Sequence, residues 1–230
     1  YKNFEFIIID DCSTDDTISE IEQFDDDRIR LVKNKINRGL VKNLNVGLRL
    51  AKGIYIARMD SDDIALPERF AKQVQFMENN SEIGLLGTCF ESFGSHNATI
   101  KYEQDHHAIR WKQLYECHIL HPSVMIRQKV LHQNNILYNE EFKVAQDYEL
   151  WGRLSQVTEV ANLQNVLMKY RQHSETVTSK LNDRQETNSK KVQKFLFVRL
   201  GISGISTEDL NIFKQTAYHR YDGGEAYLSK

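Results

Sequence analysis

Twice within its first 63 residues the chain ends a short apolar run in a cluster of acidic residues. Residues 5–9 lead into Asp10 and Asp11, and residues 54–57 lead into the acidic stretch 60–63. Short, nearly continuous runs rich in β-branched residues are typical of strands that are buried on both faces of a parallel sheet. In open α/β sheets, ligands bind outside the carboxyl ends of the strands. The sequence therefore predicts an α/β fold in which both acidic clusters face one binding site.

Apolar residues at helical spacing alternate with these strands. Residues 17–24 and 40–51 predict helices, with Ser13 or Thr14 as the cap of the first, and residues 28–32 predict a strand between them. From residue 83 onward the pattern changes and predicts a mixed sheet. The remaining predicted elements are a helix opened by Pro67 and running through Met77, strands at 83–89, 121–126 and 160–170, a helix at 110–115, and terminal helices at 185–198 and 206–217 with an apolar stripe of Val192, Phe195, Leu196 and Val198.

The acidic stretch at residues 60–63 has the composition of a metal site. Asp60 and Asp62 are two residues apart, so they point to the same side if the strand geometry continues. Mg²⁺ or Mn²⁺ is usually bound by one or two carboxylates together with the phosphates of a ligand. The alternative is a solvated acidic turn. For Asp10 and Asp11 the choice is between contact with a nucleobase or metal and the capping of the next helix.

Residues 146–151 predict the beginning of a helix that places Asp147 in its first turn while Leu150 and Trp151 face a core. The positive end of a helix stabilises an ionised carboxylate. We therefore expect Asp147 to be ionised and able to accept a proton from an attacking hydroxyl group. The simpler interpretation is an acidic residue that only complements the helix dipole.

The overall composition excludes some classes of protein. A net charge of -2 and a pI near 6.5 give no basic surface field, so we expect no nucleic-acid partner. The three cysteines are too scattered for a disulfide framework, and we expect them to be reduced and buried in a cytoplasmic protein. No apolar run approaches the roughly 20 residues that a membrane-spanning helix requires.

Several motifs, taken in order, carry a resemblance to a known family. Together they closely resemble the family 2 glycosyltransferases, which have the GT-A fold, a mixed and mostly parallel central sheet flanked by helices. The motifs are Tyr1 to Asp15, Asn37-Arg38-Gly39, Met59 to Asp63, His121-Pro122-Ser123 and Gln146 to Trp151. The resemblance implies an inverting hexosyltransferase that takes its sugar from a UDP-sugar donor and requires Mn²⁺ or Mg²⁺.

The resemblance also implies which residues hold the donor. Asp11 looks like the residue that binds the uracil ring, and Asn37 and Arg38 look like residues near the base and the diphosphate. His173 lies in a stretch similar to the family's Tyr-Arg-x-His segment, which implies a position near the diphosphate.

For catalysis, the resemblance implies that Asp60 contacts the ribose or a metal-bound water. Asp62 would coordinate the metal that bridges the diphosphate. Asp147 looks like the base that deprotonates the acceptor hydroxyl. Gln146 stands where the family commonly has a glutamate before this base. This departure bears on how the acceptor is positioned and not on the identity of the base.

The resemblance divides the chain into a glycosyltransferase domain at residues 1–180 and a helical C-terminal extension at residues 181–230. It implies a role in bacterial surface polysaccharide or lipopolysaccharide synthesis, with a glycan or a lipid-linked acceptor. The terminal helices are expected to pack on the core or on a second subunit, or to contact a membrane peripherally.

The family has a strand and a helix before the first motif, and neither is found in this sequence. We therefore expect either a truncated product with impaired donor binding or a sheet that a partner completes, for example in a homodimer. The alternative to an active enzyme is a catalytically impaired remnant that serves as a binding or assembly subunit.

Overall fold

The structure is a computed structural model and describes residues 1–172 and 182–221. Its elements are β1 (Phe6–Asp10), α1 (Thr17–Glu22), β2 (Ile29–Lys33), α2 (Leu40–Leu50), β3 (Tyr55–Ala57), β4 (Ile64–Ala65), α3 (Arg69–Asn79), β5 (Ile83–Gly94), β6 (Ala98–Ile100), α4 (His106–Lys112), the 3-10 helix η1 (His121–Ser123), β7 (Met125–Arg127), α5 (Gln128–Gln133), α6 (Gln146–Leu154), β8 (Glu159–Gln172), α8 (Asn182–Arg199) and α9 (Thr207–Tyr221). None of the helices described is long and apolar enough to cross a membrane.

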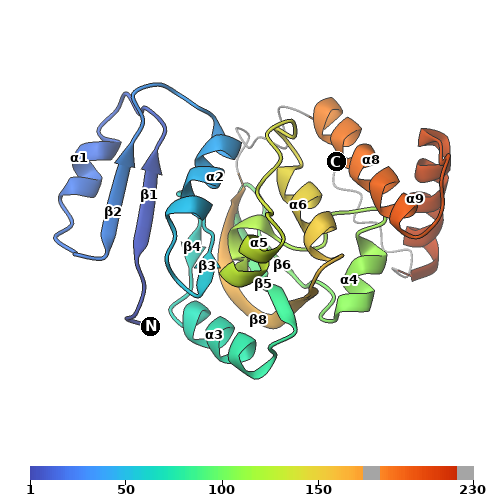
Figure 1. Ribbon diagram of the computed structural model, residues 1–230, viewed down its shortest axis with the longest axis horizontal. Helices are drawn as coiled ribbons and strands as arrows, with labels where there is room; N and C mark the ends of the chain where they lie inside the picture. Colours follow the sequence, from blue (N-terminus) through green and yellow to red (C-terminus); the bar gives the residue numbers. More distant parts are fainter. Residues whose placement is uncertain (173–181, 222–230) are drawn as a thin grey trace.

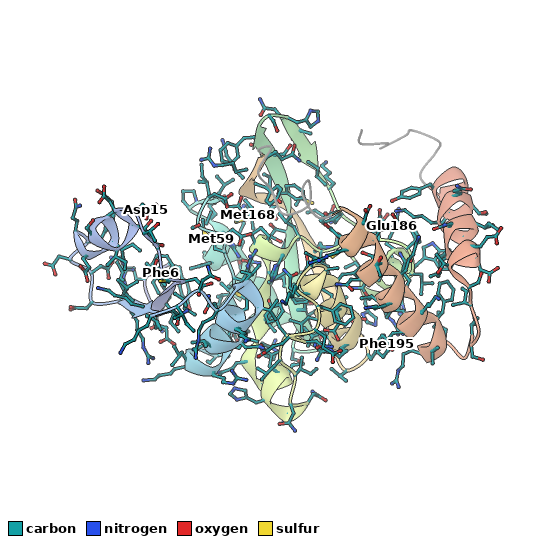
Figure 2. The ribbon with its side chains drawn as sticks, turned by 90° about the horizontal axis from the view of Figure 1, so that it is seen from above. Phe6, Asp15, Met59, Met168, Glu186 and Phe195 are labelled. Atoms are coloured by element: carbon teal, nitrogen blue, oxygen red, sulfur yellow. The ribbon has the colours of Figure 1, made fainter. Side chains whose placement is uncertain are left out.

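The strands form two sheets, with β1 and β2 paired apart from a six-stranded main sheet. The main sheet has the order β3-β7-β5-β8-β4, and β6 pairs with β5. Figure 1 shows β1, β2 and α1 at one end of the molecule and α8 and α9 at the other. Figure 2 shows the same separation, with Phe6 and Asp15 at one end and Glu186 and Phe195 at the other. The predicted α/β class is confirmed.

The pairing is less parallel than predicted. In the part of the chain that the structure describes, only β1–β2 and β5–β8 pair in parallel, and the other pairs are antiparallel. Antiparallel strands can be joined by tight connections, as β5 and β6 are here across residues 95–97. The mixed sheet expected after residue 83 is confirmed.

The prediction that β1 is buried on both faces is wrong. Phe6 is 47% exposed, and residues 7–9 are only partly buried. The reason is that β1 has one neighbouring strand among those described, while α2 covers it closely enough for a Cβ on Gly47 to lie 3.5 Å from Cδ1 of Ile9. Side chains on a two-stranded sheet stay partly in contact with water.

Several predicted boundaries shift. Helix α3 begins at Arg69 rather than at Pro67, and α4 ends at Lys112 where a helix over 110–115 was expected. The strand expected at 121–126 is divided into η1 and β7, because Pro122 has no amide hydrogen to give to a strand ladder. All three cysteines are free, as predicted, but Cys12 is exposed.

The two terminal helices pack on the rest of the chain. Val192 and Leu196 of α8 lie against Gly152 of α6, where an added Cβ would be 3.4 Å and 3.5 Å from their side chains. These residues join Leu210 of α9 and Tyr148 of α6 in one buried cluster. The apolar stripe predicted on α8 is therefore half right: Val192 and Leu196 are buried, Phe195 and Val198 are exposed, and Phe197 is buried instead.

We expect a Leu196→Ala substitution to lower the free energy of unfolding by about 2–5 kcal/mol, because it leaves a cavity between α8 and α6. Val198→Ala is the matched control on the same helix, and because Val198 is 55% exposed its effect should stay within about 0.5 kcal/mol. Urea unfolding followed by circular dichroism measures both. Equal effects of the two substitutions would contradict the packing of α8 on α6.

Candidate functional site

Asp10 is the last residue of β1. Its buried carboxylate accepts hydrogen bonds from the backbone amides of Cys12 (3.1 Å) and Ser13 (3.2 Å), and Cys12 has a left-handed backbone with φ of 68°. The expectation that Ser13 or Thr14 caps α1 is wrong. Asp16 is the N-cap and makes no side-chain cap bond, while Asp15 accepts the amide of Thr17 at 3.0 Å. Asp10 therefore shapes the turn after the strand.

Asp11 forms hydrogen bonds with the segment that follows β2, residues 34–39. Its carboxylate accepts the backbone amides of Arg38 (2.7 Å) and Gly39 (2.8 Å) and the side-chain amide of Asn34 (3.0 Å). Gly39 has φ of 83°, a conformation that glycine adopts without strain. Asn37 and Arg38, both exposed, are thus held beside the end of β1. The hydrogen-bond donors that stabilise the adjacent carboxylates of Asp10 and Asp11 are therefore supplied by the chain itself.

These bonds change the acidity of Asp11. Partial burial works to raise the pKa of this carboxyl group, but the amides of Arg38 and Gly39 and the side chains of Asn43 and Asn34 together lower it to about 2. A carboxyl group with a folded-state pKa below its unfolded value stabilises the fold above the unfolded pKa. That contribution is lost as the pH falls toward the folded pKa.

We expect Asp11→Asn to lower the free energy of unfolding by roughly 1–2 kcal/mol at neutral pH, after allowance for solvent screening. The difference from the wild type should be constant above about pH 5 and should shrink as the pH falls from 4 toward 2, because both proteins then lack the charge. Denaturant titrations between pH 7 and pH 3 measure it. A difference that grows on acidification would contradict this role of Asp11.

The turn after β3 is organised by Arg58. Its guanidinium binds both carboxylate oxygens of Asp60, with 2.7 Å from Nη1 to Oδ2. The side chain of Arg58 is 9% exposed and that of Asp60 is 35% exposed. Burial raises the pKa of Asp60, and the charge of Arg58 opposes this rise. Asp60 therefore sits at the edge of the site with its carboxylate oriented by Arg58.

The buried side chain of Arg69 forms hydrogen bonds that hold this turn in place. It is buried at the beginning of α3, and its Nη2 donates to the carbonyl oxygens of Arg58 (2.7 Å) and Val124 (3.3 Å). Its Nε donates to Gln73 Oε1 at 3.1 Å. Burial lowers the pKa of Arg69 to about 10, so this residue stays charged at neutral pH. The end of β3 is thereby fixed to α3.

Asp62 and Asp63 continue the turn toward β8. Asp63 is buried and accepts the backbone amide of Arg171 at 2.8 Å, and Nε of Arg171 donates to the carbonyl oxygen of Asp62 at 2.9 Å. Asp62 itself is exposed. Asp63, which the sequence did not single out, therefore ties the acidic turn to the main sheet, and Asp62 presents its carboxylate at the surface.

The chemistry of this cluster fits Mg²⁺ or Mn²⁺. Asp60 and Asp62 offer carboxylate oxygens, the ligand type that such hard cations take from proteins. Among the residues that the structure describes, no three Asp, Glu, His or Cys side chains gather as a metal site. Mg²⁺ usually completes its six ligands with phosphate oxygens and water, so one or two carboxylates suffice.

Asp147 lies in the first turn of α6, as predicted, directly after Ala145, which has a left-handed φ of 56°. Asp147 as a whole is half-buried, and its Oδ2 lies 3.9 Å from Sγ of Cys117. Contrary to the expected stabilisation of its charge, burial raises the pKa of Asp147 against the opposing effects of the Tyr148 amide and Arg58. A carboxylate that binds a proton more readily is better suited to act as a base.

The acidic turn lies close enough to Asp147 for their charges to interact. The charge of Arg58 lowers the pKa of Asp147 and the charge of Asp60 raises it, so residues that are far apart in the sequence interact electrostatically here. Nε2 of His121 lies 2.7 Å from the hydroxyl of Tyr138, and burial, with a contribution from the charge of Arg58, lowers the pKa of His121 well below its usual value. His121 is therefore neutral, and it is hydrogen-bonded to Tyr138.

The structure thus brings together some of the predicted residues and leaves others apart. Asp60 and Asp62 lie together in the turn after β3, and the charges of Asp60 and Arg58 act on Asp147. A second group lies at the end of β1 and consists of Asp11, Asn37 and Arg38. His173 lies outside the described residues. Arg58 was missed, although an arginine two residues before an acidic cluster at a strand end is a signal that the sequence contains.

Comparison with known proteins identifies the family. The model of glycosyl transferase family 2 matches residues 1–141. An uncharacterized glycosyltransferase of Haemophilus influenzae is 32% identical over 207 residues, which cover 84% of this chain and 64% of that protein. The amylovoran biosynthesis glycosyltransferase AmsE of Erwinia amylovora is 35% identical over 152 residues, 63% of this chain and 54% of its own length.

A third relative matches a shorter segment. The Escherichia coli enzyme WfaP, named UDP-Glc:alpha-D-GlcNAc-diphosphoundecaprenol beta-1,3-glucosyltransferase, is 46% identical over 78 residues, which cover 34% of this chain and 31% of WfaP. The chain spans less than two thirds of the length of each of these three relatives.

Solved structures agree on the fold. Residues 1–349 of TarS from S. aureus, in complex with UDP-GlcNAc, superpose with a TM-score of 0.69 at 18% identity, covering 96% of this chain and 65% of that one. The mannosyltransferase PcManGT of Pyrobaculum calidifontis, in complex with GDP-Man and Mn²⁺, gives a TM-score of 0.57 at 14% identity, covering 95% and 61%. The fold is GT-A. With a family model over residues 1–141 and a relative 32% identical across most of its length, the chain belongs to glycosyl transferase family 2.

Proposed function

We propose that the chain transfers a hexose from a UDP-sugar to a hydroxyl group of a glycan or lipid-linked acceptor, with inversion at the anomeric carbon. The observation that carries the proposal is that Asp147 lies within electrostatic reach of the Arg58–Asp60 pair, because a carboxylate of raised pKa is then near an acidic turn suited to a metal. The UDP donor is supported by WfaP, whose name specifies UDP-Glc.

In the proposed reaction, the acceptor hydroxyl gives its proton to the carboxylate of Asp147. The hydroxyl oxygen forms a bond with the anomeric carbon while the bond from that carbon to the diphosphate oxygen breaks, and UDP leaves with the electron pair. Attack from the face opposite UDP inverts the configuration. Asp62 would hold a divalent cation, which would supply neutralising charge for the leaving diphosphate, and Asp60 would contact the ribose or help to hold the cation.

Asp11, Asn37 and Arg38 are proposed to bind the nucleoside. Asp11 fixes the backbone of residues 38 and 39, so the exposed side chains of Asn37 and Arg38 start from a rigid position. A guanidinium is well suited to a phosphate, since it donates two parallel hydrogen bonds. His173 is proposed to lie near the diphosphate.

The biological role that we propose is assembly of a surface polysaccharide on the cytoplasmic side of the membrane. AmsE is named for amylovoran biosynthesis, and WfaP for an acceptor linked to diphosphoundecaprenol. Residues 1–180 are proposed as the transferase domain, with 181–230 as a helical extension that contributes to its core.

The proposal is tested by incubating the purified chain and Mn²⁺ with UDP-glucose or UDP-N-acetylglucosamine and a synthetic N-acetylglucosaminyl diphospholipid. We expect release of UDP and a product whose new linkage, read by nuclear magnetic resonance, has the configuration opposite to that of the donor. A product that retains the donor configuration would contradict Asp147 as a base for direct displacement. Donor binding without product would favour the alternative, a binding or assembly subunit.

A further inference from the structure

The last turns of α8 and the segment after them expose a row of large apolar side chains. Phe195 is 39% exposed, Val198 55%, Leu200 51% and Ile202 48%. We call these four residues the α8 ridge. Phe195 and Val198 are three residues apart on the helix, so they are neighbours on its surface, and both are exposed, whereas Val192 and Leu196 are buried against α6. Soluble proteins rarely place this many large apolar groups together at the surface without a partner.

The shape of the ridge is fixed by the end of the helix. Gly201 adopts φ of 83°, and its amide donates to the carbonyl oxygen of Val198 at 2.9 Å. The amide of Ile202 donates to the carbonyl oxygen of Phe197 at 3.0 Å. This pair of bonds is the Schellman motif, which glycine favours because it tolerates a left-handed conformation. Leu200 and Ile202 are therefore held beside the helix end.

The surroundings of the ridge are basic. From residue 187 to residue 207 the sequence contains no Asp or Glu, but it contains Lys190, Lys191, Lys194 and Arg199. Lys190 forms an ion pair with Glu186 at 2.5 Å, while Lys191 and Arg199 are exposed. An apolar ridge with cations along its sides complements a surface that is anionic outside and apolar beneath.

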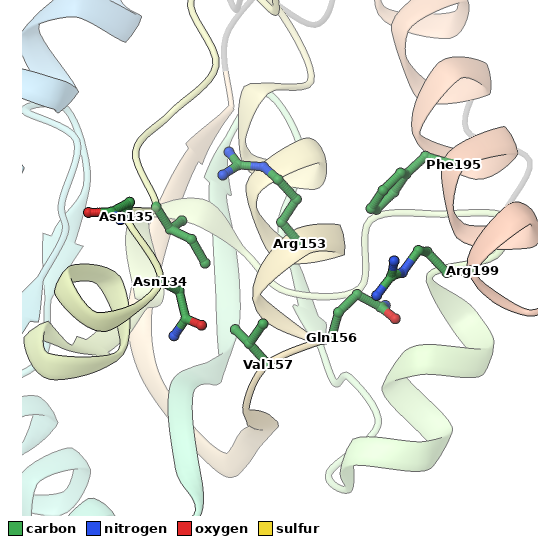
Figure 3. Close-up of a pocket in the computed structure, with 8 residues that line it drawn as sticks. Asn134, Asn135, Arg153, Gln156, Val157, Phe195 and Arg199 are labelled. Carbon is green, nitrogen blue, oxygen red and sulfur yellow. The ribbon is translucent and has the colours of Figure 1, made fainter.

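Beside the ridge lies a hollow of about 280 Å³ with a mixed polar and apolar lining, which Figure 3 shows between α6, α8 and residues 134–136. Phe195 and Arg199 line it from α8, and Arg153 and Gln156 line it from the region of α6. Arg153 is already bound by both oxygens of Glu149, at 2.7 Å each, so Arg199 supplies the positive charge that remains. Such a hollow suits a phosphate head group.

We propose that the α8 ridge docks on an anionic phospholipid membrane. The ridge side chains enter the boundary between head groups and acyl chains, while Lys191, Lys194 and Arg199 lie against lipid phosphates. Peripheral helices bind membranes through this combination of buried apolar area and attraction to anionic lipids. Each basic residue near such a surface contributes about 1 kcal/mol.

A second copy of the chain is a poorer occupant. In a two-fold symmetric dimer the same patch meets itself, so Lys191, Lys194 and Arg199 of both copies would face one another. Repulsion between these like charges opposes the contact, whereas a membrane of anionic lipids attracts them.

The position of the ridge deepens the proposed function, on which this part of the inference rests. Helix α8 runs along α6: Asn188 donates to the carbonyl of Val144 near Asp147, and Phe195 and Arg199 lie near Gln156 beyond the other end of α6. The eight residues from Asp147 to Leu154 make seven steps of 1.5 Å and so span about 10 Å along the helix. An acceptor anchored in the membrane would therefore extend its sugar along α6 to reach Asp147.

Co-sedimentation of the full chain with vesicles tests the proposal. We expect the wild type to sediment with vesicles that contain phosphatidylglycerol and to stay in solution with phosphatidylcholine alone. Lys191→Ala together with Lys194→Ala should weaken partitioning about 25-fold, or roughly fivefold for each basic residue. Phe195→Ser together with Val198→Ser should weaken it at least about tenfold.

Ile212→Ser together with Lys214→Ala is the matched control, because it removes an exposed apolar and an exposed basic residue of α9 and should leave partitioning unchanged. Circular dichroism verifies that each variant is folded. Wild-type sedimentation that is equal with both kinds of vesicle would overturn the proposal. So would a dimer, seen by light scattering, that the ridge substitutions dissociate. Asp147→Asn should sediment as the wild type does, so a failed transfer reaction would leave the membrane result intact.

Discussion

Asp147→Asn is expected to lower the rate of sugar transfer by a factor of about 10²–10⁴, the usual contribution of a positioned general base. The amide that replaces the carboxylate cannot accept the proton of the acceptor hydroxyl. Because asparagine has nearly the same shape, it can keep the first turn of α6 and the contact with Cys117 in place. Turnover measured as UDP release should therefore fall through kcat, while the affinity for UDP stays the same.

The matched control is Asp209→Asn. Asp209 also lies in the first turn of a helix, α9, where its backbone amide donates to the hydroxyl of Ser206 at 3.0 Å and its carboxylate accepts the backbone amide of Ser206 at 2.8 Å. This substitution makes the same chemical change in a similar local structure away from the site, and it should leave kcat unaltered. Full activity of Asp147→Asn would assign the base to another residue.

Asp62→Ala is expected to remove the metal dependence of donor binding. Asp62 presents its carboxylate at the exposed edge of the acidic turn, while Arg58 holds both oxygens of Asp60. Loss of even an outer partner of a metal ligand commonly costs about 10–100-fold in metal affinity, and we expect at least this much for Asp62. Electron paramagnetic resonance of free Mn²⁺, titrated with protein in the presence of UDP, measures the uptake directly.

Asp27→Ala serves as the control, because it removes an exposed acidic residue of equal charge in the connection before β2. It should take up Mn²⁺ with UDP as the wild type does. If Asp62→Ala also behaves as the wild type, the cation is held elsewhere, and the assignment of the acidic turn as its site is wrong.

The alternation of strands and helices up to β3 could be predicted, because each element shows its own apolar periodicity. The exposure of β1 could not, since burial depends on how many strands lie beside it. The same limit applies to β5 and β8, which extend to Gly94 and Gln172, beyond the predicted ends. Polar residues such as Glu91 continue the ladder with β8, and their pairing depends on a partner distant in the sequence.

Some residues of the proposed site could likewise be predicted from the sequence, and others could not. Asp60, Asp62 and Asp147 were found because their motifs are local, and α6 does begin just before Asp147. Arg58, Arg69 and Asp63 were missed because their roles come from burial and from contacts with α3 and β8.

The acidity of Asp147 was misjudged for a related reason. The helix N-terminus, visible in the sequence, favours its charge, but burial under other elements raises its pKa and outweighs that effect. Packing of this kind becomes visible only in three dimensions.

The most direct test of the account is a calorimetric titration of the wild-type chain with UDP, with and without Mn²⁺. If the acidic turn is a site for a nucleoside diphosphate and its metal, UDP should bind with Mn²⁺ and at least about tenfold more weakly without it, because the diphosphate then faces Asp60 and Asp62 without a cation between them. Binding that does not depend on Mn²⁺, or no binding of UDP at all, would contradict the central claim.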